Sequence, residues 1–380
     1  MSAFPKNWTN LDTIRACRFC LMCRHVCTVG NATANESDTP RGKTLLLYSM
    51  LMETVRPSTE MAGVVNNCAL CYRCKEDCVG GFDVPQVMLA TRAEVAEDGL
   101  CPDSVLRRVE SLRAKRAQDM KKQDKLRVKV ESAVGNLPEK AQTVLLGGDS
   151  ISTYTPTAVL GAAKLLKEAG VDFTLPKGEN HSGFEFYEMG FISDAKKEAL
   201  STVDALSEAL DASKGVPTVV VLDPSDNWAL DDLYGKWGVE TPFKVVDFSS
   251  FIHRLAKEGR IKFRRRDIEL TYHDPCHLGR LYRVFQQPRE LLTMIPGVVL
   301  KEMHWNQGQA HCCGGHLKFT NPEVADRIGT QRIEQIQEIG VHVVVTGCPT
   351  CCDALDRASD SMIDDLEVYH IAEFLAGSLI

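Results

Sequence analysis

The chain has 380 residues, of which 44% are hydrophobic and 25% are charged, and its formal net charge is -7 at pH 7. This length suits two or three compact domains, and the composition is that of an ordinary globular protein. The negative charge argues against nucleic acid as a partner, and no apolar run approaches the roughly 20 residues of a membrane-spanning helix. We therefore expect a cytoplasmic protein whose 15 cysteines are mainly metal ligands, since disulfides are rare in a reducing compartment.

Two runs of four cysteines near the N-terminus share one spacing. The first run is Cys17, Cys20, Cys23 and Cys27, and the second is Cys68, Cys71, Cys74 and Cys78. This spacing is typical of proteins with two [4Fe-4S] clusters, in which the fourth cysteine of each run binds the neighbouring cluster. It predicts one cluster on Cys17, Cys20, Cys23 and Cys78 and another on Cys68, Cys71, Cys74 and Cys27. A structural zinc site instead pairs two ligand couples across a loop.

The first 100 residues hold both runs and predict a helical variant of the two-cluster ferredoxin domain. Between the runs, residues 42–61 are rich in Leu and Met and are expected to form a helix. Residues 101–139 are dense in charged side chains with sparse, periodic apolar ones. This pattern is typical of exposed helices, and we expect a helical linker between two domains.

Beyond residue 140 the pattern changes to strands that alternate with helices. Strands are expected at residues 143–146, 218–222, 244–246, 269–272 and 341–345, and helices at 158–169 and 322–339. Such alternation indicates parallel sheets covered by helices. Residues 216–230 resemble 341–355, and residues 243–255 resemble 366–378. We therefore expect an α+β multidomain protein in which two similar α/β lobes, residues 140–262 and 263–380, follow the ferredoxin-type domain.

The last lobe carries a second group of cysteines. Cys276 and the pair Cys348 and Cys351 each follow a predicted strand, at the edge where open α/β sheets assemble their sites. Cys312 and Cys313 are adjacent and are followed by two glycines. Adjacent cysteines cannot point the same way from a regular strand or helix, so we expect an irregular loop whose glycines make room for a bulky group.

The motifs HDPCHLGR, HCCGG and TGCPTCC resemble the cysteine-rich CCG domain of heterodisulfide reductase catalytic subunits. The same domain occurs in the iron-sulfur subunits of glycolate oxidase and of anaerobic glycerol-3-phosphate dehydrogenase, and TPRGK (residues 39–43) resembles an element of the glycolate oxidase type. The resemblance implies a third, noncubane [4Fe-4S] cluster on Cys276, Cys312, Cys313, Cys348 and Cys351. A structural zinc site on these cysteines is the alternative.

The first lobe is expected to be a degenerate copy of the CCG domain. Gly148, His181, Ser182, Asp223 and Asp226 stand where the resemblance would place ligand cysteines. Two interpretations follow: these residues bind a hard or borderline metal, or the lobe is retained for its fold alone. We favour the second.

Several other side chains are weaker candidates. Cys352 is expected to be a spare thiol or a hydrogen-bond donor near the cluster, and Cys101 a small buried hydrophobic residue. The histidines beside the last cysteine groups are expected to hydrogen-bond to sulfur or backbone, and one of them could supply protons; they are His273, His277, His311 and His316.

Together these features predict the iron-sulfur, electron-transferring subunit of a multisubunit flavin-linked dehydrogenase. No nucleotide-binding fingerprint follows a strand, so a partner flavoprotein would oxidise the substrate, of the 2-hydroxy acid or glycerol 3-phosphate type. The acceptor would be a quinone, an electron-transfer flavoprotein or another iron-sulfur protein, with peripheral attachment to the inner face of the membrane through partners. The alternative is a heterodisulfide reductase-like catalytic subunit that reduces a disulfide at the noncubane cluster.

Overall fold

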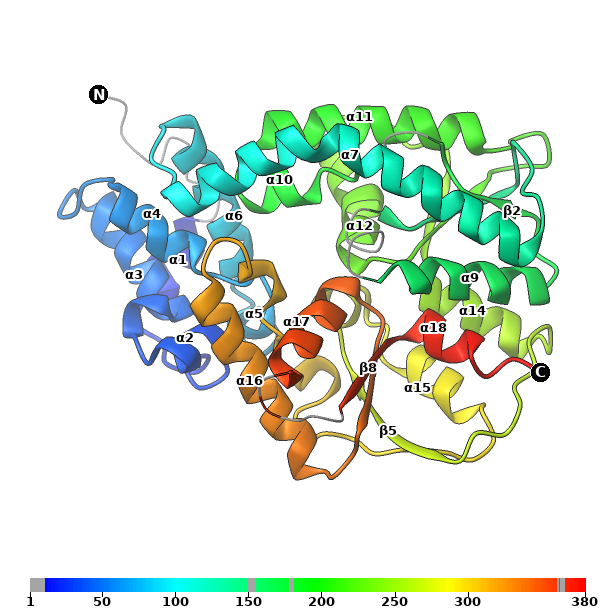
Figure 1. The fold of residues 1–380 in the computed structure, drawn as a ribbon. Coiled ribbons are helices and arrows are strands. Elements are labelled where there is room, and N and C mark those ends of the chain that lie inside the picture. Colours follow the sequence, from blue (N-terminus) through cyan, green and yellow to red (C-terminus); the bar gives the residue numbers. More distant parts are fainter. Residues whose placement is uncertain (1–10, 149–154, 178–180, 361, 363–365) are drawn as a thin grey trace.

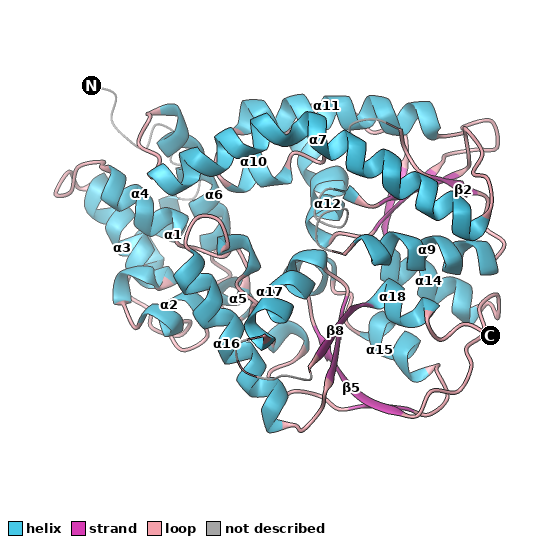
Figure 2. Cartoon of the chain, viewed as in Figure 1, coloured by secondary structure: helices cyan, strands magenta, loops and turns pink. Residues whose placement is uncertain are grey.

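The computed structural model describes residues 11–148, 155–177, 181–360, 362 and 366–380, with the backbone alone for residues 116–120. A group of helices near the N-terminus lies on one side of the molecule, and the strands lie in two separate groups on the other (Figures 1 and 2). Helix α7 (Asp103–Val134) runs along one edge of the molecule from the N-terminal helices to the strands, and α11 (Ile192–Ala209) lies beside it (Figure 1). The structure thus combines a helical N-terminal part with sheet-containing parts, as the sequence predicts.

Short helices separate and support the cysteine runs in the N-terminal part. They are α1 (Leu11–Cys17), α2 (Thr28–Thr33), α3 (Pro40–Leu51), α4 (Thr59–Asn66), α5 (Arg73–Glu76) and α6 (Val84–Glu97).

The single helix expected over residues 42–61 is wrong, because α3 ends at Leu51 and α4 begins only at Thr59. Pro57 lacks a backbone N–H and disfavours helix at the preceding residue. Ser58 then caps α4 by accepting the Met61 N–H at 3.2 Å. The proline and the capping serine explain the break between the two helices.

Residues of the predicted linker form one long helix, α7 (Asp103–Val134). Its two ends pack into different cores: Val105, Val109 and Leu112 join the core of the N-terminal helices, and Leu126 and Val130 join a second core. The helix is therefore less exposed than its charged sequence suggests, because its few apolar residues face inward.

The strands form two parallel four-stranded sheets with equivalent strand orders, β2-β1-β3-β4 and β6-β5-β7-β8. The first sheet contains β1 (Thr143–Leu146), β2 (Phe173–Thr174), β3 (Thr218–Val221) and β4 (Lys244–Asp247), and the second contains β5 (Ile268–His273), β6 (Val298–Leu300), β7 (Val343–Thr346) and β8 (Glu367–His370). Pairing is in register along β1 and β3, from Thr143 opposite Thr218 to Leu146 opposite Val221. The five predicted strands are confirmed. Three strands were not predicted: β2 and β6, which are too short to give a hydrophobic run, and β8.

Helices cover the faces of both sheets, as parallel connections require. Around the first sheet lie α9 (Pro156–Glu168), α10 (Phe184–Glu188), α11 (Ile192–Ala209), α12 (Pro224–Trp228), α13 (Tyr234–Lys236) and α14 (Phe248–Lys257). Around the second lie α15 (Gln286–Thr293), α16 (Pro322–Glu338), α17 (Pro349–Ser359) and α18 (Ile371–Ala376). The predicted helices at 158–169 and 322–339 are confirmed as α9 and α16.

The two sheets are joined by the packing of α9 against α18. A Cβ on Gly161 of α9 would lie only 2.5 Å from the backbone carbonyl oxygen of Ala372 in α18. Only glycine allows the two helices to approach this closely. One apolar core runs through both sheets at this contact and includes Ala162 and Phe374.

Candidate iron-sulfur sites

The first cysteine run forms the loop between two short helices. Cys17 is the last residue of α1, and Cys27 caps α2, where its sulfur accepts a backbone N–H at 3.4 Å. Burial raises the pKa of Cys17, and Cys78 and Cys20 raise it further, so these three thiols lie near one another. Cys20 is exposed. The structure therefore brings the last cysteine of the second run to the first.

The fourth cysteine of the first run faces the second run in the same way. Burial raises the pKa of Cys27 to about 11, with a contribution from nearby Cys71 and Cys68. The thiol of Cys74 is also buried and lies near Cys68, Cys71 and Cys27. These four cysteines line one cavity. Sulfurs from both runs around one space are what crossed ligation of a cluster requires.

The five cysteines of the second sheet come from three loops at one edge. Cys276 follows β5, and Cys348 follows β7 and is the N-cap of α17, with Cys351 in the first turn of that helix. Cys312 and Cys313 lie in the irregular loop that the sequence predicts, just before a short 3-10 turn (Gly315–Leu317). All five are buried.

These five sulfurs form a continuous group. Cys313 Sγ lies 3.3 Å from Cys351 Sγ. The thiol of Cys312 lies close to those of Cys276 and Cys313, and the thiol of Cys351 lies close to that of Cys348. Hydrogen bonds from Cys312 and Cys351 lower the pKa of Cys313 well below its ordinary value, so the group favours a thiolate at its centre. Thiolate is the form that binds metal.

Glycine is required beside the cysteine pair. Gly314 has a φ of 83°, in the left-handed region, and a Cβ there would lie 2.7 Å from the carbonyl oxygen of Ala325 in α16. The glycines of the CCGG motif thus let the loop turn tightly against α16. This turn sets the positions of Cys312 and Cys313.

The N-terminal cysteines and the second-sheet cysteines meet at one contact. The thiol of Cys71 in the second run lies close enough to Cys312 for each to shift the pKa of the other. His277 Nε2 donates to the carbonyl of Leu70 at 3.1 Å, and Arg280 donates to the carbonyl of Cys71 at 2.7 Å. Backbone and sulfur contacts therefore fix the two groups against each other.

Two family descriptions match these two groups of cysteines. The "4Fe-4S dicluster domain" matches residues 16–83, and the "Cysteine-rich domain", CCG, matches residues 270–356. The chain carries a dicluster domain and a CCG domain. These matches confirm the resemblance that the cysteine motifs indicate.

Relatives that resemble the chain include named oxidoreductase subunits. One subunit of the fumarate reductase (CoM/CoB) of Methanothermobacter marburgensis is 26% identical, over 98% of this chain and 73% of the relative. One subunit of the dihydromethanophenazine:CoB–CoM heterodisulfide reductase of Methanosarcina barkeri is 27% identical, over 86% and 81%. The probable iron-sulfur-binding oxidoreductase FadF of Bacillus subtilis is 30% identical, over 57% of this chain and 31% of the relative.

The fold is also similar to a solved structure. The crystal structure of a hypothetical protein from Helicobacter pylori aligns with a TM-score of 0.51 and 9% identity, covering 89% of this chain and 68% of that one. This similarity concerns the fold alone. Among the described residues, no helix is both long and apolar enough to cross a membrane.

Buried positive side chains lie around the cysteines of both domains. Lys43 is 2% exposed and donates from Nζ to the carbonyl of Asp38 at 2.5 Å. Its charge lowers the pKa of Cys27, against the larger effect of burial. Buried lysine is rare unless its charge is offset, and here the buried carboxylate of Asp38 pairs with Lys43 Nζ at 3.7 Å.

Buried arginines also lie near the cysteines, one on the dicluster side and one inside the CCG lobe. Arg92 is buried and donates to the carbonyls of Cys68 at 2.6 Å and Glu188 at 2.6 Å. Arg332 is fully buried and donates from Nε to His273 Nδ1 at 3.1 Å. These cations were not predicted from the sequence. Lys43 and Arg280 lie inside the quoted motifs TPRGK and HDPCHLGR, which could have indicated them, whereas Arg332 in α16 has no such signal.

The histidines near the CCG cysteines differ in charge. Burial lowers the pKa of His277 to about 3. Its Nε2 donates to Leu70, so its neutral Nδ1 accepts the Ser225 hydroxyl at 3.1 Å. Burial disfavours charge on His316 too, but the carboxylate of Glu188, 2.9 Å away, raises its pKa to about 9. A neutral and a positively charged histidine thus lie side by side, with ring centroids 4.9 Å apart.

His273 lies at the centre of the sulfur group, because its ring nitrogen, Cys313 Sγ and Cys351 Sγ all lie within 4.8 Å of one another. Burial lowers the pKa of His273, and that of His311 to about 4. His311 stacks on Trp305 and pairs with Gln335 at 2.8 Å. Cys352 is buried in α17, and Cys101 is buried in the core of the N-terminal helices, as expected of a small hydrophobic residue.

In the first sheet, polar residues occupy the equivalent edge. Asp223 is the N-cap of α12 and accepts the Ser225 N–H at 2.8 Å, as Cys348 is the N-cap of α17. Asp226 accepts the Ser182 hydroxyl at 2.5 Å. Gly148 lies against the same carboxylate, since a Cβ there would be 2.0 Å from Asp226 Oδ2.

A pocket lies between the two sheets beside the CCG site. Its lining combines polar residues of the first lobe with residues next to the CCG cysteines; these include His181, Ser182, Asp226, Gly315, His316 and Thr350. The edge of the first sheet therefore faces the CCG site across this pocket.

Proposed function

We propose that the chain is the iron-sulfur, electron-transfer subunit of a multisubunit flavin-linked dehydrogenase, of the 2-hydroxy acid or glycerol 3-phosphate type. The observation that carries this proposal is the close approach of the thiols of Cys71 in the dicluster domain and Cys312 in the CCG domain. It makes the two groups of cysteines immediate neighbours inside the protein. Such proximity suits a chain of redox centres, in which the polypeptide sets position and potential.

The proposed ligand sets follow the groups described above. One [4Fe-4S] cluster takes Cys17, Cys20, Cys23 and Cys78, and the second takes Cys68, Cys71, Cys74 and Cys27. A third, noncubane [4Fe-4S] cluster takes Cys276, Cys312, Cys313, Cys348 and Cys351. Each cluster, when bound, accepts and releases one electron at a time. The protein supplies buried thiolates and buried cations, among them Lys43 and Arg280, that offset the negative charge of such a site.

We also propose the domain division behind these sites. Residues 1–100 form the dicluster domain and residues 101–139 the helical linker. Residues 140–262 form a degenerate CCG-like lobe, and residues 263–380 form the CCG lobe that binds a cluster. The two sheets with equivalent strand order support this division.

The substrate would be oxidised on a partner flavoprotein, because the sequence carries no fingerprint for a flavin or a nicotinamide nucleotide. The electron acceptor would be a quinone, an electron-transfer flavoprotein or another iron-sulfur protein. Purification of the native protein without oxygen tests the proposal directly. We expect a flavoprotein to co-purify, iron and sulfide in cluster amounts, and interacting S = 1/2 signals in EPR of the reduced protein. Zinc with little sulfide would contradict it.

A second candidate function is reduction of a disulfide at the CCG site. The pocket between the two sheets favours it, because it gives a small molecule access to His316 and Thr350 beside the CCG cysteines. A relative named as part of a CoB–CoM heterodisulfide reductase also supports it. The dithionite-reduced protein, mixed with this heterodisulfide, would then release free thiols. Absence of thiol release, with all clusters present, would favour the first candidate.

A further inference from the structure

Exposed apolar side chains gather around the first cysteine run. Val79 is 91% exposed, Phe19 75%, Met22 58% and Leu21 54%. Among the described residues, half of the fourteen large hydrophobic side chains that are exposed precede residue 80. We name Phe19, Leu21, Met22 and Val79 the cluster 1 patch. Single exposed apolar residues are ordinary, but a contiguous group indicates a binding surface.

The cluster 1 patch borders the proposed ligands of the first cluster. Phe19 and Leu21 flank Cys20, which is itself exposed, and Val79 directly follows Cys78. Cys78 and Cys20 both lie near Cys17, so the two segments of the patch meet at one site. By contrast, the cysteines of the CCG domain are buried, with exposures of 8% or less. The first cluster would therefore be the one closest to a protein docked from outside.

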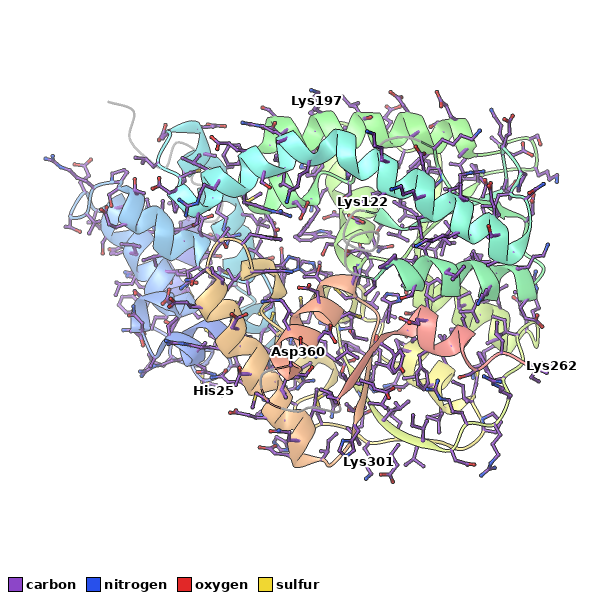
Figure 3. All side chains as sticks on the ribbon, in the orientation of Figure 1. His25, Lys122, Lys197, Lys262, Lys301 and Asp360 are labelled. Carbon is purple, nitrogen blue, oxygen red and sulfur yellow. The ribbon has the colours of Figure 1, made fainter. Side chains whose placement is uncertain are left out.

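Arginines flank the part of the cluster 1 patch that lies in the first cysteine run. Arg15 is exposed, the guanidinium of Arg18 lies 4.0 Å from the centre of the Phe19 ring, and the exposed Arg24 pairs with Glu36 at 3.0 Å. His25, labelled in Figure 3, is exposed as well. Residues 11–25 contain three arginines and one acidic residue, Asp12, in a chain with a net charge of -7. The patch is thus an apolar centre with a locally positive rim.

We propose that the cluster 1 patch docks an acidic electron-carrier protein, whose redox group exchanges one electron with the cluster held by Cys17, Cys20, Cys23 and Cys78. The inference rests on the proposed function, since it requires that cluster. An acidic partner complements the arginine rim and would be steered to the patch by the opposite charge. A second copy of this chain fits less well, because a two-fold interface would bring the same arginines together.

Pre-steady-state electron transfer from a reduced, acidic two-[4Fe-4S] ferredoxin to the oxidised full-length protein tests the inference. We expect Val79→Glu and Arg15→Glu each to slow the transfer on the order of tenfold or more. Transfer to the wild-type protein should also slow as salt rises. Val216→Glu and Lys197→Glu are matched controls on other exposed surfaces, at 60% exposure for Val216, and should leave the rate unchanged.

Reduction by dithionite and the iron content separate this inference from the proposed function. If the wild-type protein lacks the N-terminal clusters, the proposed function itself fails. If the clusters are present and all variants behave like wild type, or ferredoxin reduces none of them, the docking inference is overturned. It is also overturned if Val79→Glu instead releases the protein from phosphatidylglycerol vesicles or dissociates a homodimer while transfer from ferredoxin is unchanged. If Val79→Glu loses cluster iron, Arg15→Glu becomes the deciding variant, because Arg15 lies outside the cysteine loops.

Discussion

The two four-stranded sheets have equivalent strand orders but carry different chemistry at their carboxyl edges. Asp223 and Cys348 each occupy the N-cap position of the helix that follows the third strand of their sheet, and of the two it is Asp223 that accepts a backbone N–H there. In the first sheet the residues of this edge bond to one another, as Asp226 does to Ser182, whereas in the second sheet the sulfurs form one group. The fold tolerates either residue type at this position, with or without the capping hydrogen bond. Metal chemistry can therefore be gained or lost at this edge while the fold remains.

The sheets also differ in how they contact the dicluster domain. The first sheet shares an apolar core with the N-terminal helices, which includes Met88, Val144 and Trp228. The lobe of the second sheet contacts the dicluster domain through a separate, smaller apolar core, which includes Val29 and Ile328, and through polar groups such as the Arg280 contact with the carbonyl of Cys71. Both contacts stabilise the assembly, and the second also brings proposed redox sites together.

The largest expected effect follows from removing sulfur from the second sheet alone. We expect a Cys312→Ser, Cys313→Ser double variant to lose one cluster's worth of iron while the EPR signals of the dicluster domain persist. Electron transfer to the acceptor should then fall below detection. Iron analysis and EPR of the protein prepared without oxygen measure this. Cys352→Ser is the control, because this buried neighbour is not a proposed ligand; unchanged iron in the double variant, with loss of zinc, would make the site structural.

A smaller effect concerns pH, because the two sheets cap equivalent helices with different groups. His370 caps α18 by accepting the Ala372 N–H at 3.2 Å, and burial lowers its pKa from 6.5 to about 4. Between these two pKa values the unfolded chain binds a proton on His370 that the folded chain does not. The contribution of neutral His370 to the free energy of unfolding is therefore present above pH 6.5 and is lost as pH falls toward 4. We expect wild type to lose about 2 kcal/mol more than His370→Asn between pH 7 and 4.5, as measured by urea unfolding.

Asp247, the corresponding cap of α14 in the first sheet, should respond with the opposite sign. Burial raises its pKa, so its folded form binds a proton more readily than the unfolded chain and its contribution weakens as pH rises. If the free energy of unfolding of His370→Asn and of wild type changed equally with pH, the His370 cap of α18 would not be the cause of the change.

A matched pair of cap substitutions sharpens the comparison further. Asp223→Ala removes the acceptor for the Ser225 N–H and should reduce the free energy of unfolding by about 1 kcal/mol, with no change in iron. Cys348→Ala should instead lower the iron content. Urea unfolding and iron analysis of both variants test this. Iron detected near Asp223 by anomalous scattering would show that the first lobe also binds metal.

The smallest expected effect concerns the contact that only the second sheet makes with Cys71. Arg280→Met removes a buried positive charge, so the added electron is less well stabilised. The reduction potential of the neighbouring cluster should therefore fall by roughly 30 to 60 mV. For one electron, 59 mV corresponds to about 1.4 kcal/mol. Redox titration followed by EPR measures the shift. Arg280→Lys keeps the charge and should retain most of the potential; equal shifts in both would indicate a change of geometry.

The sequence predicts the two domains and several strands well, because cysteine spacing and hydrophobic runs are local signals. Thr143 to Leu146, for example, is a fully buried strand in the structure as in the prediction. The break at Pro57 was not predicted although its signals, the proline and the capping Ser58, are local. The inward face of α7 was not predicted because it depends on tertiary packing. The same holds for the Cys71 contact with Cys312, which joins residues far apart in the chain. Buried Arg332 likewise gives no sequence signal, since its role depends on the neighbours that folding supplies.

The long helix α7 has a consequence for how the protein unfolds. Its N-terminal half belongs to the core shared by the dicluster domain and the first sheet, and its C-terminal half belongs to the core that joins both sheets. Melting any one part would expose apolar surface on α7 that stabilises another. We therefore expect a single cooperative transition in calorimetry, and we expect residues 1–100, expressed alone, to be prone to aggregation.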